Sequence, residues 1–479
     1  MKLLHLFLLS CFHFNIVLSA SPVFHFTIHR RGGAFPTEDV ADLAFLTQEV
    51  AAAEARFNLT IREFKGNKVI RKARIREDSS DHGPLMGDVG QHGRWFAKLK
   101  LGDPPQETEV DLDMLTSDLF VFTTTSNKGS RFDDLWSQSY TKPTKHPHPS
   151  CGIATDILEL RKTNVSVPIS FAHCKPSKSS LQTLLSSGSL LGLAPSKSLS
   201  ETMTPSLIEQ LDKAHLIDHP IWSLSLINAH EGVFSVGGTL ADVVERVDTQ
   251  TKKQLDQIGG SEGYNVAPGA VEATREKRGG TTAAAKDTGM DWRSKWRWSK
   301  VQGAEGWWQI LMQGAWVEKT KVLKNQPVVI DLNTPFILAP PNSARILYAS
   351  ISGSRPLPPP YDAFHMFPCL NPPELHFEFG GWAFPALHGE RGLEWSGRPG
   401  GKFSLGRIDE GSGYCVGAIV ETRMGLGSDE ANGGDAQGQA MGNNGMRDVW
   451  VIGERFFWGV GGVFDVAEKT IAILSLLHM

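Results

Sequence analysis

Two aspartates in matching sequence contexts are the residues of this chain best suited to chemistry. Asp113 and Asp331 each follow an apolar stretch, and each is followed three residues later by a threonine, Thr116 or Thr334, and then by a second apolar stretch. A carboxylate at the end of a buried strand is costly unless it is hydrogen-bonded or functional. Two such carboxylates that meet can share a proton and activate a water molecule. The repeat therefore predicts an acid–base pair with a threonine hydroxyl beside each carboxylate; the alternative is that each carboxylate only caps a turn.

Short apolar segments separated by turn residues surround both aspartates and predict an all-β fold. The expected strands are 95–101, 110–113, 119–122, 165–171, 222–227, 233–236, 307–312, 327–330, 375–379 and 463–474. Helices are expected over 41–57, where Thr37 can cap the first turn, and over 206–214. The separation of the two aspartates suits two lobes of similar size, each carrying one carboxylate.

Several short motifs occur in the order typical of one family. They are 101–106 (Leu-Gly-Asp-Pro-Pro-Gln), 189–194 (Ser-Leu-Leu-Gly-Leu-Ala), 234–238 (Phe-Ser-Val-Gly-Gly) and 451–457 (Val-Ile-Gly-Glu-Arg-Phe-Phe), together with the two aspartate motifs. In this order they resemble the pepsin family of aspartic peptidases, over roughly residues 94–474. The resemblance implies a bilobal double-psi β-barrel fold with a cleft between the lobes. It also implies a secreted endopeptidase that cleaves peptide bonds at acid pH with Asp113 and Asp331.

Both aspartate motifs depart from the family's Asp-Thr-Gly pattern. Met114 and Leu332 stand where the family has threonines that exchange hydrogen bonds across the lobe interface. We expect their side chains to pack together there but neither to donate nor to accept a hydrogen bond. Leu115 and Asn333 stand where the family has glycines, and leucine tolerates a left-handed backbone poorly. The family's flap tyrosine corresponds to Lys145, in a proline-rich segment.

These departures leave two functions open. The first is an aspartic endopeptidase, in which one carboxylate is the general base while the other polarises the peptide carbonyl. The second is a catalytically inactive pepsin-fold protein, a pseudopeptidase, that binds a peptide, a glycan or a protein partner. The second function is open because catalytic geometry must be held to roughly half an ångström, and the lost residues are those that hold it in the family.

The first 20 residues have the pattern of a signal peptide. Lys2 precedes an apolar run over 3–18, which ends at the small residues Ser19 and Ala20. A membrane anchor is the alternative, but polar residues interrupt the run and it is short for a span. We therefore expect a protein of the secretory pathway, extracellular or vacuolar, with no stable membrane span.

Residues 21–88 are expected to form a prosegment. The stretch 62–76 carries seven Lys and Arg residues against one acid, and Arg71 with Lys72 offers a dibasic cleavage site. A basic segment that stays attached is the alternative. The resemblance favours a prosegment, because enzymes of the pepsin family are made as zymogens whose basic prosegment pairs with an acidic cleft.

The rest of the chain is expected to form an N-terminal lobe over 89–235 and a C-terminal lobe over 236–479. Two polar stretches near 248–291 and 425–447 are rich in glycine and small polar residues. Neither can bury enough apolar surface to order itself, so both are predicted to be flexible insertions within the second lobe.

Four cysteines remain once Cys11 leaves with the signal peptide. An even number in an exported chain indicates two disulfides, and proximity pairs Cys151 with Cys174 and Cys369 with Cys415. The sequence has no Cys-x-x-Cys spacing and no cysteine–histidine cluster that would indicate a metal site, so no metal or other cofactor is expected.

Composition excludes several classes of protein. The 479 residues carry a formal net charge of −4, with 41% apolar and 21% charged residues. The chain is therefore neither disordered throughout nor a multi-span membrane protein, and no basic field indicates nucleic acid. Sequons at Asn58 and Asn164 predict a glycoprotein. We expect a monomer whose partner is a polypeptide substrate, or a peptide ligand bound in the cleft.

Overall fold

The structure is a computed structural model of the whole chain. It describes residues 24–31, 39–64, 94–122, 132–145, 151–160, 165–174, 189–195, 204–226, 230–237, 297–302, 306–386, 401–422, 448–458 and 460–475. The predicted signal peptide, both predicted insertions, the dibasic site, Thr37 and Asn164 lie outside these residues. The other sequon residue, Asn58, lies within a helix.

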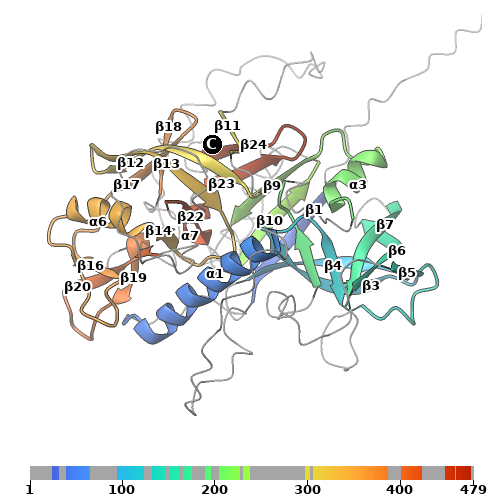
Figure 1. Cartoon of the computed structure of the whole chain (residues 1–479), viewed down its shortest axis with the longest axis horizontal. Coiled ribbons are helices and arrows are strands. Elements are labelled where there is room, and N and C mark those ends of the chain that lie inside the picture. The colour runs from blue at the N-terminus through green and yellow to red at the C-terminus, as the bar shows by residue number, and fades with distance from the viewer. Residues whose placement is uncertain are drawn as a thin grey trace, which may run out of the picture.

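The described part of the first half consists of one long helix, one short helix and a series of strands (Figure 1). Its elements are β1 (Phe24–Arg30), α1 (Leu43–Phe64), β2 (Trp95–Leu101), β3 (Gln106–Asp113), β4 (Leu119–Phe122), β5 (Thr141–Lys145), β6 (Cys151–Leu160), β7 (Val165–Cys174), β8 (Ser189–Gly192), α3 (Leu207–Lys213), β9 (Ile221–Leu226) and β10 (Glu231–Val236).

The described part of the second half is also mostly strand. Its elements are β11 (Trp298–Lys300), β12 (Gln309–Val317), β13 (Thr320–Ile330), β14 (Ile337–Ala339), α6 (Pro341–Ala349), β15 (Arg355–Pro356), β16 (His365–Pro368), β17 (Leu375–Phe379), β18 (Trp382–Pro385), a 3-10 turn (Gly401–Phe403), β19 (Ser404–Arg407), β20 (Tyr414–Gly417), β21 (Ile419–Glu421), β22 (Trp450–Ile452), α7 (Glu454–Phe457), β23 (Val460–Asp465) and β24 (Thr470–Ser475). The described chain is thus mostly β-structure, which agrees with the predicted class.

One arrangement of four strands occurs in both halves. In the first half β3 runs parallel to β8, β8 antiparallel to β4, and β4 parallel to β7. In the second half β13 runs parallel to β22, β22 antiparallel to β14, and β14 parallel to β21. The sequence repeat around the two aspartates therefore corresponds to a repeat in strand pairing.

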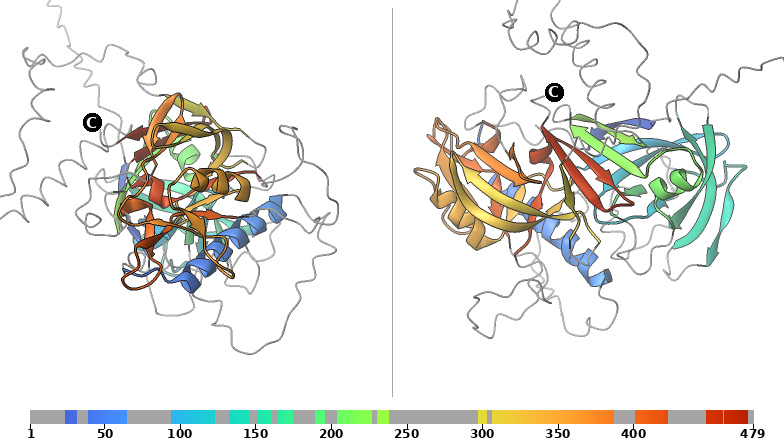
Figure 2. Two further views of the ribbon diagram at one scale, coloured as in Figure 1. Left: turned by 90° about the vertical axis from the view of Figure 1, so that its left-hand side faces the viewer. Right: turned by 90° about the horizontal axis from the view of Figure 1, so that it is seen from above.

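The two halves are joined by a shared sheet. Within the described residues, the strand order β11-β24-β23-β9-β10-β1-β2-β3 places the last strands of the chain beside strands of the first half. The predicted lobe boundary after residue 235 falls inside β10. Figure 2 (right) shows the two halves on either side of β23 and β24.

An aromatic cluster fills the junction of the two halves. Trp222 of β9 stacks on Phe464 of β23 with 3.8 Å between ring centroids, and Trp308 meets Phe464 edge-on at 5.1 Å. The Trp308 indole also donates to the carbonyl of Leu193, at 2.7 Å. Because these large rings are fully buried, they account for much of the stabilisation of the junction.

Helix α1 crosses the junction on one face of the molecule (Figures 1 and 2). Its buried apolar residues are Leu46, Val50, Ala53 and Phe57, which recur at helical spacing. Phe57 packs edge-on against Trp307 of the second half, at 5.6 Å between centroids. The predicted helix over 41–57 is therefore present and extends further, to Phe64.

Local signals explain where several other elements begin and end. Helix α3 starts at a capping box, in which the Ser206 hydroxyl accepts from the Glu209 amide and the Glu209 carboxylate accepts from the Ser206 amide. The single strand expected over 463–474 is instead the hairpin β23–β24, which turns through Lys469 in a left-handed conformation. Helix α6 was not predicted from the sequence, although it begins with Pro341 and proline is favoured in the first turn of a helix.

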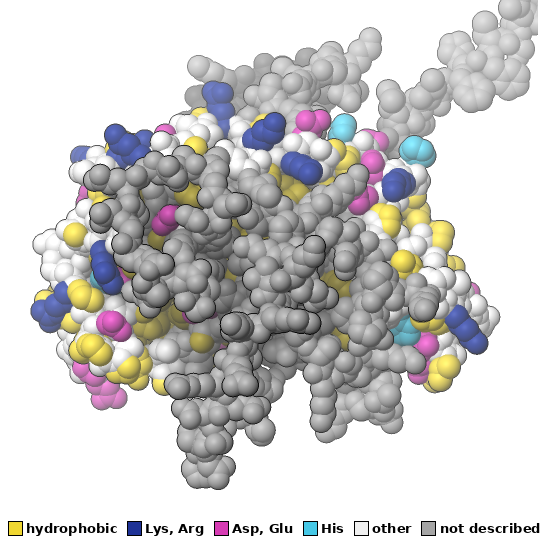
Figure 3. Space-filling view, in the orientation of Figure 1, with side chains coloured by type: hydrophobic (Ala, Val, Ile, Leu, Met, Phe, Trp, Pro, Cys, Tyr) yellow, Lys and Arg dark blue, Asp and Glu magenta, His cyan; other side chains and the backbone are white. Residues whose placement is uncertain are grey.

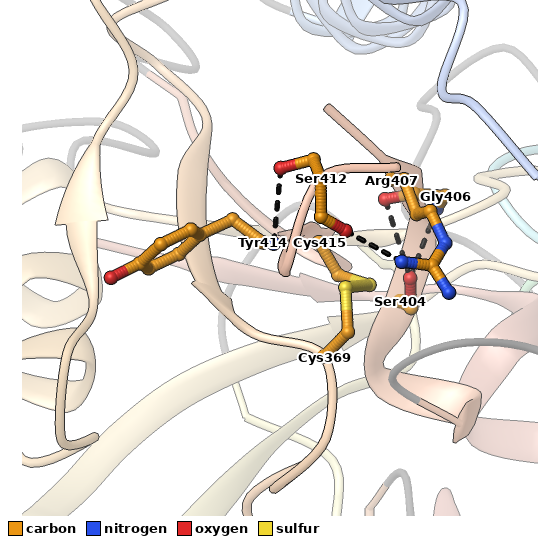
Figure 4. Close-up of a disulfide and its surroundings, with 7 residues drawn as sticks. All are labelled: Cys369, Ser404, Gly406, Arg407, Ser412, Tyr414 and Cys415. Carbon is orange, nitrogen blue, oxygen red and sulfur yellow. Dashed lines mark hydrogen bonds between the residues drawn. A yellow bond between two sulfur atoms is a disulfide. The ribbon is translucent and has the colours of Figure 1, made fainter. Parts of the chain in front are cut away.

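The two disulfides join Cys151 to Cys174 and Cys369 to Cys415, the pairs that the sequence predicts. The second bridge ties β20 to the chain after β16, and Figure 4 shows its surroundings. There the Arg407 guanidinium donates to the Ser412 carbonyl at 2.6 Å and the Ser412 hydroxyl accepts from the Tyr414 amide at 3.1 Å.

None of the helices that the structure describes combines the length and the apolar character that a membrane crossing requires.

Candidate active site

The two aspartates lie at equivalent places in the repeated strand arrangement. Asp113 is the last residue of β3, and Asp331 directly follows β13. These are the strands that pair in parallel with β8 and β22. The exposed fraction of Asp113 is 5% and that of Asp331 is 0%. Both carboxylates are thus buried at strand ends and must be compensated by neighbouring groups.

The hydrogen bonds around the two carboxylates differ. Asp331 Oδ2 accepts from the Thr334 hydroxyl at 2.5 Å, as the sequence predicts. Asp113 Oδ2 accepts from the backbone amide of Thr116 at 2.9 Å. The Thr116 hydroxyl itself is buried and has no hydrogen-bond partner among the described residues. The expectation that Thr116 would support Asp113 through its hydroxyl is therefore wrong, because its amide fills that place.

Two glycines allow the aspartate loops to lie against the neighbouring strands. Gly192 ends β8 and Gly453 follows β22. A Cβ atom would lie 2.5 Å from the Ser117 carbonyl carbon at Gly192 and 2.0 Å from the Phe336 carbonyl oxygen at Gly453. Directly afterwards, matching amides donate to the loop threonine carbonyls at 2.8 Å, from Ala194 to Thr116 and from Glu454 to Thr334. The motifs at 189–194 and 451–457 therefore supply the close approach that each loop requires.

The backbone strain expected at Leu115 is not present. Among the described residues other than glycine, positive φ occurs at His215, Glu318, Asn325 and Lys469. Neither aspartate loop therefore needs a left-handed backbone at the positions where the family has glycine.

The aspartate loops also bond to each other, which the sequence did not predict. The Leu332 amide donates to the Met114 sulfur at 3.3 Å, so Met114 accepts a hydrogen bond that we did not expect of it. The Asn333 side-chain amide donates to the Leu112 carbonyl at 2.6 Å. Two contacts thus link the segment around Asp113 to the segment around Asp331.

Arg56 of helix α1 reaches this site. Its Nη2 donates to Asp331 Oδ2 and lies 3.5 Å from the Thr334 hydroxyl. Burial lowers the pKa of Arg56 to about 10, while the negative charges of Asp113 and Glu49 act to raise it and Arg94 acts to lower it further. Arg56 therefore stays charged at neutral pH and lies within the electrostatic reach of both aspartates.

Arg56 was not among the residues that the sequence predicts for the site, although one signal was available. The basic stretch predicted for the prosegment, 62–76, begins beyond Arg56. Arg56 follows Ala53 by three residues and precedes Phe57 by one, so it borders the buried stripe of α1. An arginine that borders the buried face of an amphipathic helix requires an acidic partner.

Two further arginines, at the end of β1 and directly after it, form ion pairs with acids of both halves. Arg30 forms an ion pair with Glu454 at 3.0 Å, and Arg31 forms one with Asp111 at 2.6 Å and one with Glu109 at 2.9 Å. Burial raises the pKa of the Glu454 and Asp111 carboxyls, and their arginine neighbours oppose that rise. The segment that carries β1 and α1 is thus held by charge pairs at Asp331, Glu454 and Asp111.

The predicted flap position lies in a β-hairpin. Lys145 pairs with Gly152 across β5 and β6, and the disulfide of Cys151 ties β6 to β7. Tyr140 precedes β5, and its hydroxyl contacts His173 Nδ1 at 2.5 Å. Tyr140 is therefore engaged with β7, and burial raises its pKa above the ordinary value.

The described residues contain no group of three His, Cys, Asp or Glu side chains close enough to hold a metal ion. The groups that the site offers for chemistry are two buried carboxylates, a threonine hydroxyl and an arginine. On the described part of the molecular face in Figure 3, basic and acidic side chains are interspersed.

Comparison with known proteins agrees with this chemistry. No family model matches the chain. An aspartic protease of Phaffia rhodozyma is 26% identical to it over 172 residues, which are 35% of this chain and 34% of that protein. The chain thus spans about a third of the length of the curated relative that it matches. This distant similarity supports the pepsin-like aspartic peptidase family for the chain.

Proposed function

We propose that this chain is the zymogen of a secreted, pepsin-like aspartic endopeptidase, in which Asp113 and Asp331 cleave peptide bonds once helix α1 has left them. The family-level support is the aspartic protease of Phaffia rhodozyma. The repeated strand arrangement supports a double-psi fold with one carboxylate in each lobe. The two disulfides suit an oxidising, extracellular or vacuolar compartment.

The observation that carries the proposal is the position of Arg56 relative to the two aspartates. Its guanidinium donates a hydrogen bond to Asp331 and interacts electrostatically with the negative charge of Asp113. A cation brought by a segment that lies before the main body neutralises two buried carboxylates that otherwise repel each other. Residues 21–88 therefore act as a prosegment that stabilises the folded chain and covers the site.

Catalysis follows once the prosegment is removed. A water molecule between the carboxylates gives one proton to the ionised aspartate, and its oxygen attacks the carbonyl carbon of the peptide. The protonated aspartate donates its proton to the carbonyl oxygen. The carbon–nitrogen bond then breaks as the aspartate that took the proton from water gives it to the nitrogen. The other aspartate takes a proton from one hydroxyl of the hydrated carbon, which leaves a carboxylic acid and restores the pair. Thr334, whose hydroxyl bonds Asp331, orients that carboxylate and favours its ionised form.

The test is cleavage of an unfolded protein by acid-treated, purified chain at about pH 3 to 5, the range in which a carboxylate pair shares one proton. We expect peptides in the wild-type reaction and none with Asp113→Asn or Asp331→Asn. The control is Asp409→Asn, a change at an exposed aspartate, which should cleave like wild type. Cleavage that persists in both dyad variants would assign the activity to a contaminant.

A pseudopeptidase that binds a peptide is the second candidate. The unequal roles of the two threonines favour it: the Thr334 hydroxyl donates to Asp331, whereas the Thr116 hydroxyl has no hydrogen-bond partner among the described residues and Asp113 accepts from the Thr116 amide instead. This candidate predicts that acid-treated wild type binds a peptide with a statine group, which mimics the hydrated peptide bond, and yet cleaves nothing.

A further inference from the structure

We propose that Met114 and Asn333 are positioning residues that lock the two aspartate loops together, through two hydrogen bonds made by atoms that the family does not use. The inference rests on the proposed peptidase function, because the purpose of the lock is to hold Asp113 and Asp331 at a fixed separation. Neither residue touches substrate in this role. Both act through the carboxylates that they hold in place.

The first bond of the lock runs from the Leu332 amide to the Met114 sulfur, at 3.3 Å. Both residues are buried, with exposed fractions of 1% and 0%. A thioether is a weak acceptor. Even so, a buried amide with no acceptor at all would destabilise the folded chain by the full free energy of its desolvation. Met114, which follows Asp113, therefore supplies the acceptor for the backbone amide of Leu332, which follows Asp331.

The second bond runs the opposite way. The side-chain amide of Asn333 donates to the carbonyl of Leu112, the residue before Asp113, at 2.6 Å. The Asn333 side-chain oxygen accepts from the Trp95 amide at 3.3 Å, and its backbone amide lies 3.4 Å from Asp331 Oδ1. Asn333 thus contacts the Asp331 carboxylate and the strand that ends in Asp113 at the same time.

Together the two bonds explain why the unusual residues occur at these positions. A threonine both accepts and donates, and the family's pair uses both capacities across the lobe interface. The Met114 side chain can only accept and the Leu332 side chain can neither donate nor accept, so a side-chain donor is missing on the second loop. Asn333 supplies that donor from the neighbouring position, where a glycine has no side chain. The departures at Met114, Leu332 and Asn333 are therefore one coupled exchange.

The experiment compares four variants of the complete chain. Asn333→Gly removes the second bond and Met114→Leu removes the first at nearly constant volume. The triple variant Met114→Thr/Leu332→Thr/Asn333→Gly replaces the lock by a threonine pair. The matched control is Asn371→Ala, which changes an exposed asparagine of the second half. The readouts are kcat and KM on a fluorogenic peptide after acid treatment, and deuterium exchange of the Leu332 amide in the untreated chain.

We expect kcat to fall about tenfold in Asn333→Gly, the loss of one buried hydrogen bond, with KM changed less than about twofold. The Leu332 amide should exchange about tenfold faster in Met114→Leu. The triple variant should recover kcat, and it should also recover folding if Asn333→Gly does not fold. Values of kcat and exchange equal to those of Asn371→Ala, or a triple variant that recovers nothing, would overturn the lock.

The exchange measurement separates the lock from the proposed function. If wild type cleaves nothing, the peptidase proposal fails. Fast exchange in Met114→Leu would then still show that the loops are bonded to each other, whereas unchanged exchange would show that the lock fails as well.

Discussion

The guanidinium of Arg56 donates to the carboxylate of Asp331 although the two residues lie 275 positions apart. Asp331 is fully buried, and Arg56 approaches it from helix α1, which belongs to the predicted prosegment. A buried carboxylate that loses such a partner is left as an uncompensated charge. The same contact therefore stabilises the folded chain and occupies the group that we propose to be catalytic.

Replacing Arg56 should separate these two effects. For Arg56→Gln we predict a loss of about 3–5 kcal/mol in the free energy of unfolding at pH 7, the cost of breaking a buried ion pair from one side. Peptide cleavage after transfer to acid should begin with a shorter lag, because the site is no longer covered by a cation. Urea unfolding and a continuous fluorogenic assay measure the two quantities.

The control for this change is Arg355→Gln, which alters an exposed arginine. It should shift the free energy of unfolding by less than about 1 kcal/mol and leave the lag unchanged. Equal behaviour of the two variants would contradict the role of Arg56.

The two threonines should respond differently to loss of their hydroxyls. Thr334→Val removes a hydrogen bond to a buried carboxylate, and we predict a loss of about 1.5–3 kcal/mol in the free energy of unfolding. Thr116→Val removes a hydroxyl with no hydrogen-bond partner among the described residues, so stability should stay the same or rise. Equal losses in the two variants would argue against the asymmetry of the site.

Close packing at the two loop glycines predicts strong destabilisation by alanine. Gly192→Ala and Gly453→Ala each place a Cβ within 2.5 Å of backbone atoms, so we expect a loss of at least about 3 kcal/mol. Gly413→Ala is the matched control, because a Cβ there meets no atom within 4 Å. Denaturant unfolding of the three variants checks the prediction, and equal stability of all three would refute it.

A cluster near the end of β21 predicts pH-dependent stability. Glu421 accepts from His365 at 2.8 Å and from Arg345 at 2.9 Å. Burial acts to raise the pKa of the Glu421 carboxyl, but these partners outweigh burial and hold it below its ordinary value of 4.5. The stabilisation is therefore complete above about pH 4.5 and is lost as the pH falls through the lower pKa of the folded state.

We predict that Glu421→Gln costs about 1–3 kcal/mol in the free energy of unfolding at pH 7. Since a protonated glutamate resembles glutamine, the difference from wild type should shrink as the pH falls from about 4.5 through the lower pKa of the folded state. Glu410→Gln, at an exposed glutamate, should match wild type throughout. A Glu421→Gln difference that does not change from pH 7 down through that pKa would exclude the cluster as its source.

The sequence predicted the strands at Trp95–Leu101, Val110–Asp113 and Leu119–Phe122 well, because apolar segments between turn residues carry a clear signal. The cysteine pairs followed from proximity. The repeated context of Asp113 and Asp331 correctly predicted that both lie at matching strand ends.

Contacts between segments far apart in the chain could not be predicted from the sequence. The bond from Asn333 to Leu112 joins loops more than two hundred positions apart, and no local pattern encodes it. The acceptor role of Met114 depends on where the Leu332 amide points. Arg56 was overlooked because its partner is defined only when α1 packs across both halves. Tertiary packing, not local propensity, thus determines how the two carboxylates are held.

The most direct test is the binding of a peptide with a statine group, measured by calorimetry at about pH 4, where one proton is shared by the pair. The samples are untreated chain, brought to pH 4 only for the measurement and within the lag, so that it still carries its prosegment, acid-treated chain whose prosegment has been removed, and acid-treated Asp331→Asn. We predict strong binding only to the acid-treated wild type, because α1 covers the site before treatment and the variant lacks the second carboxylate. Equal binding to untreated and treated chain, or to Asp331→Asn, would contradict a dyad covered by Arg56.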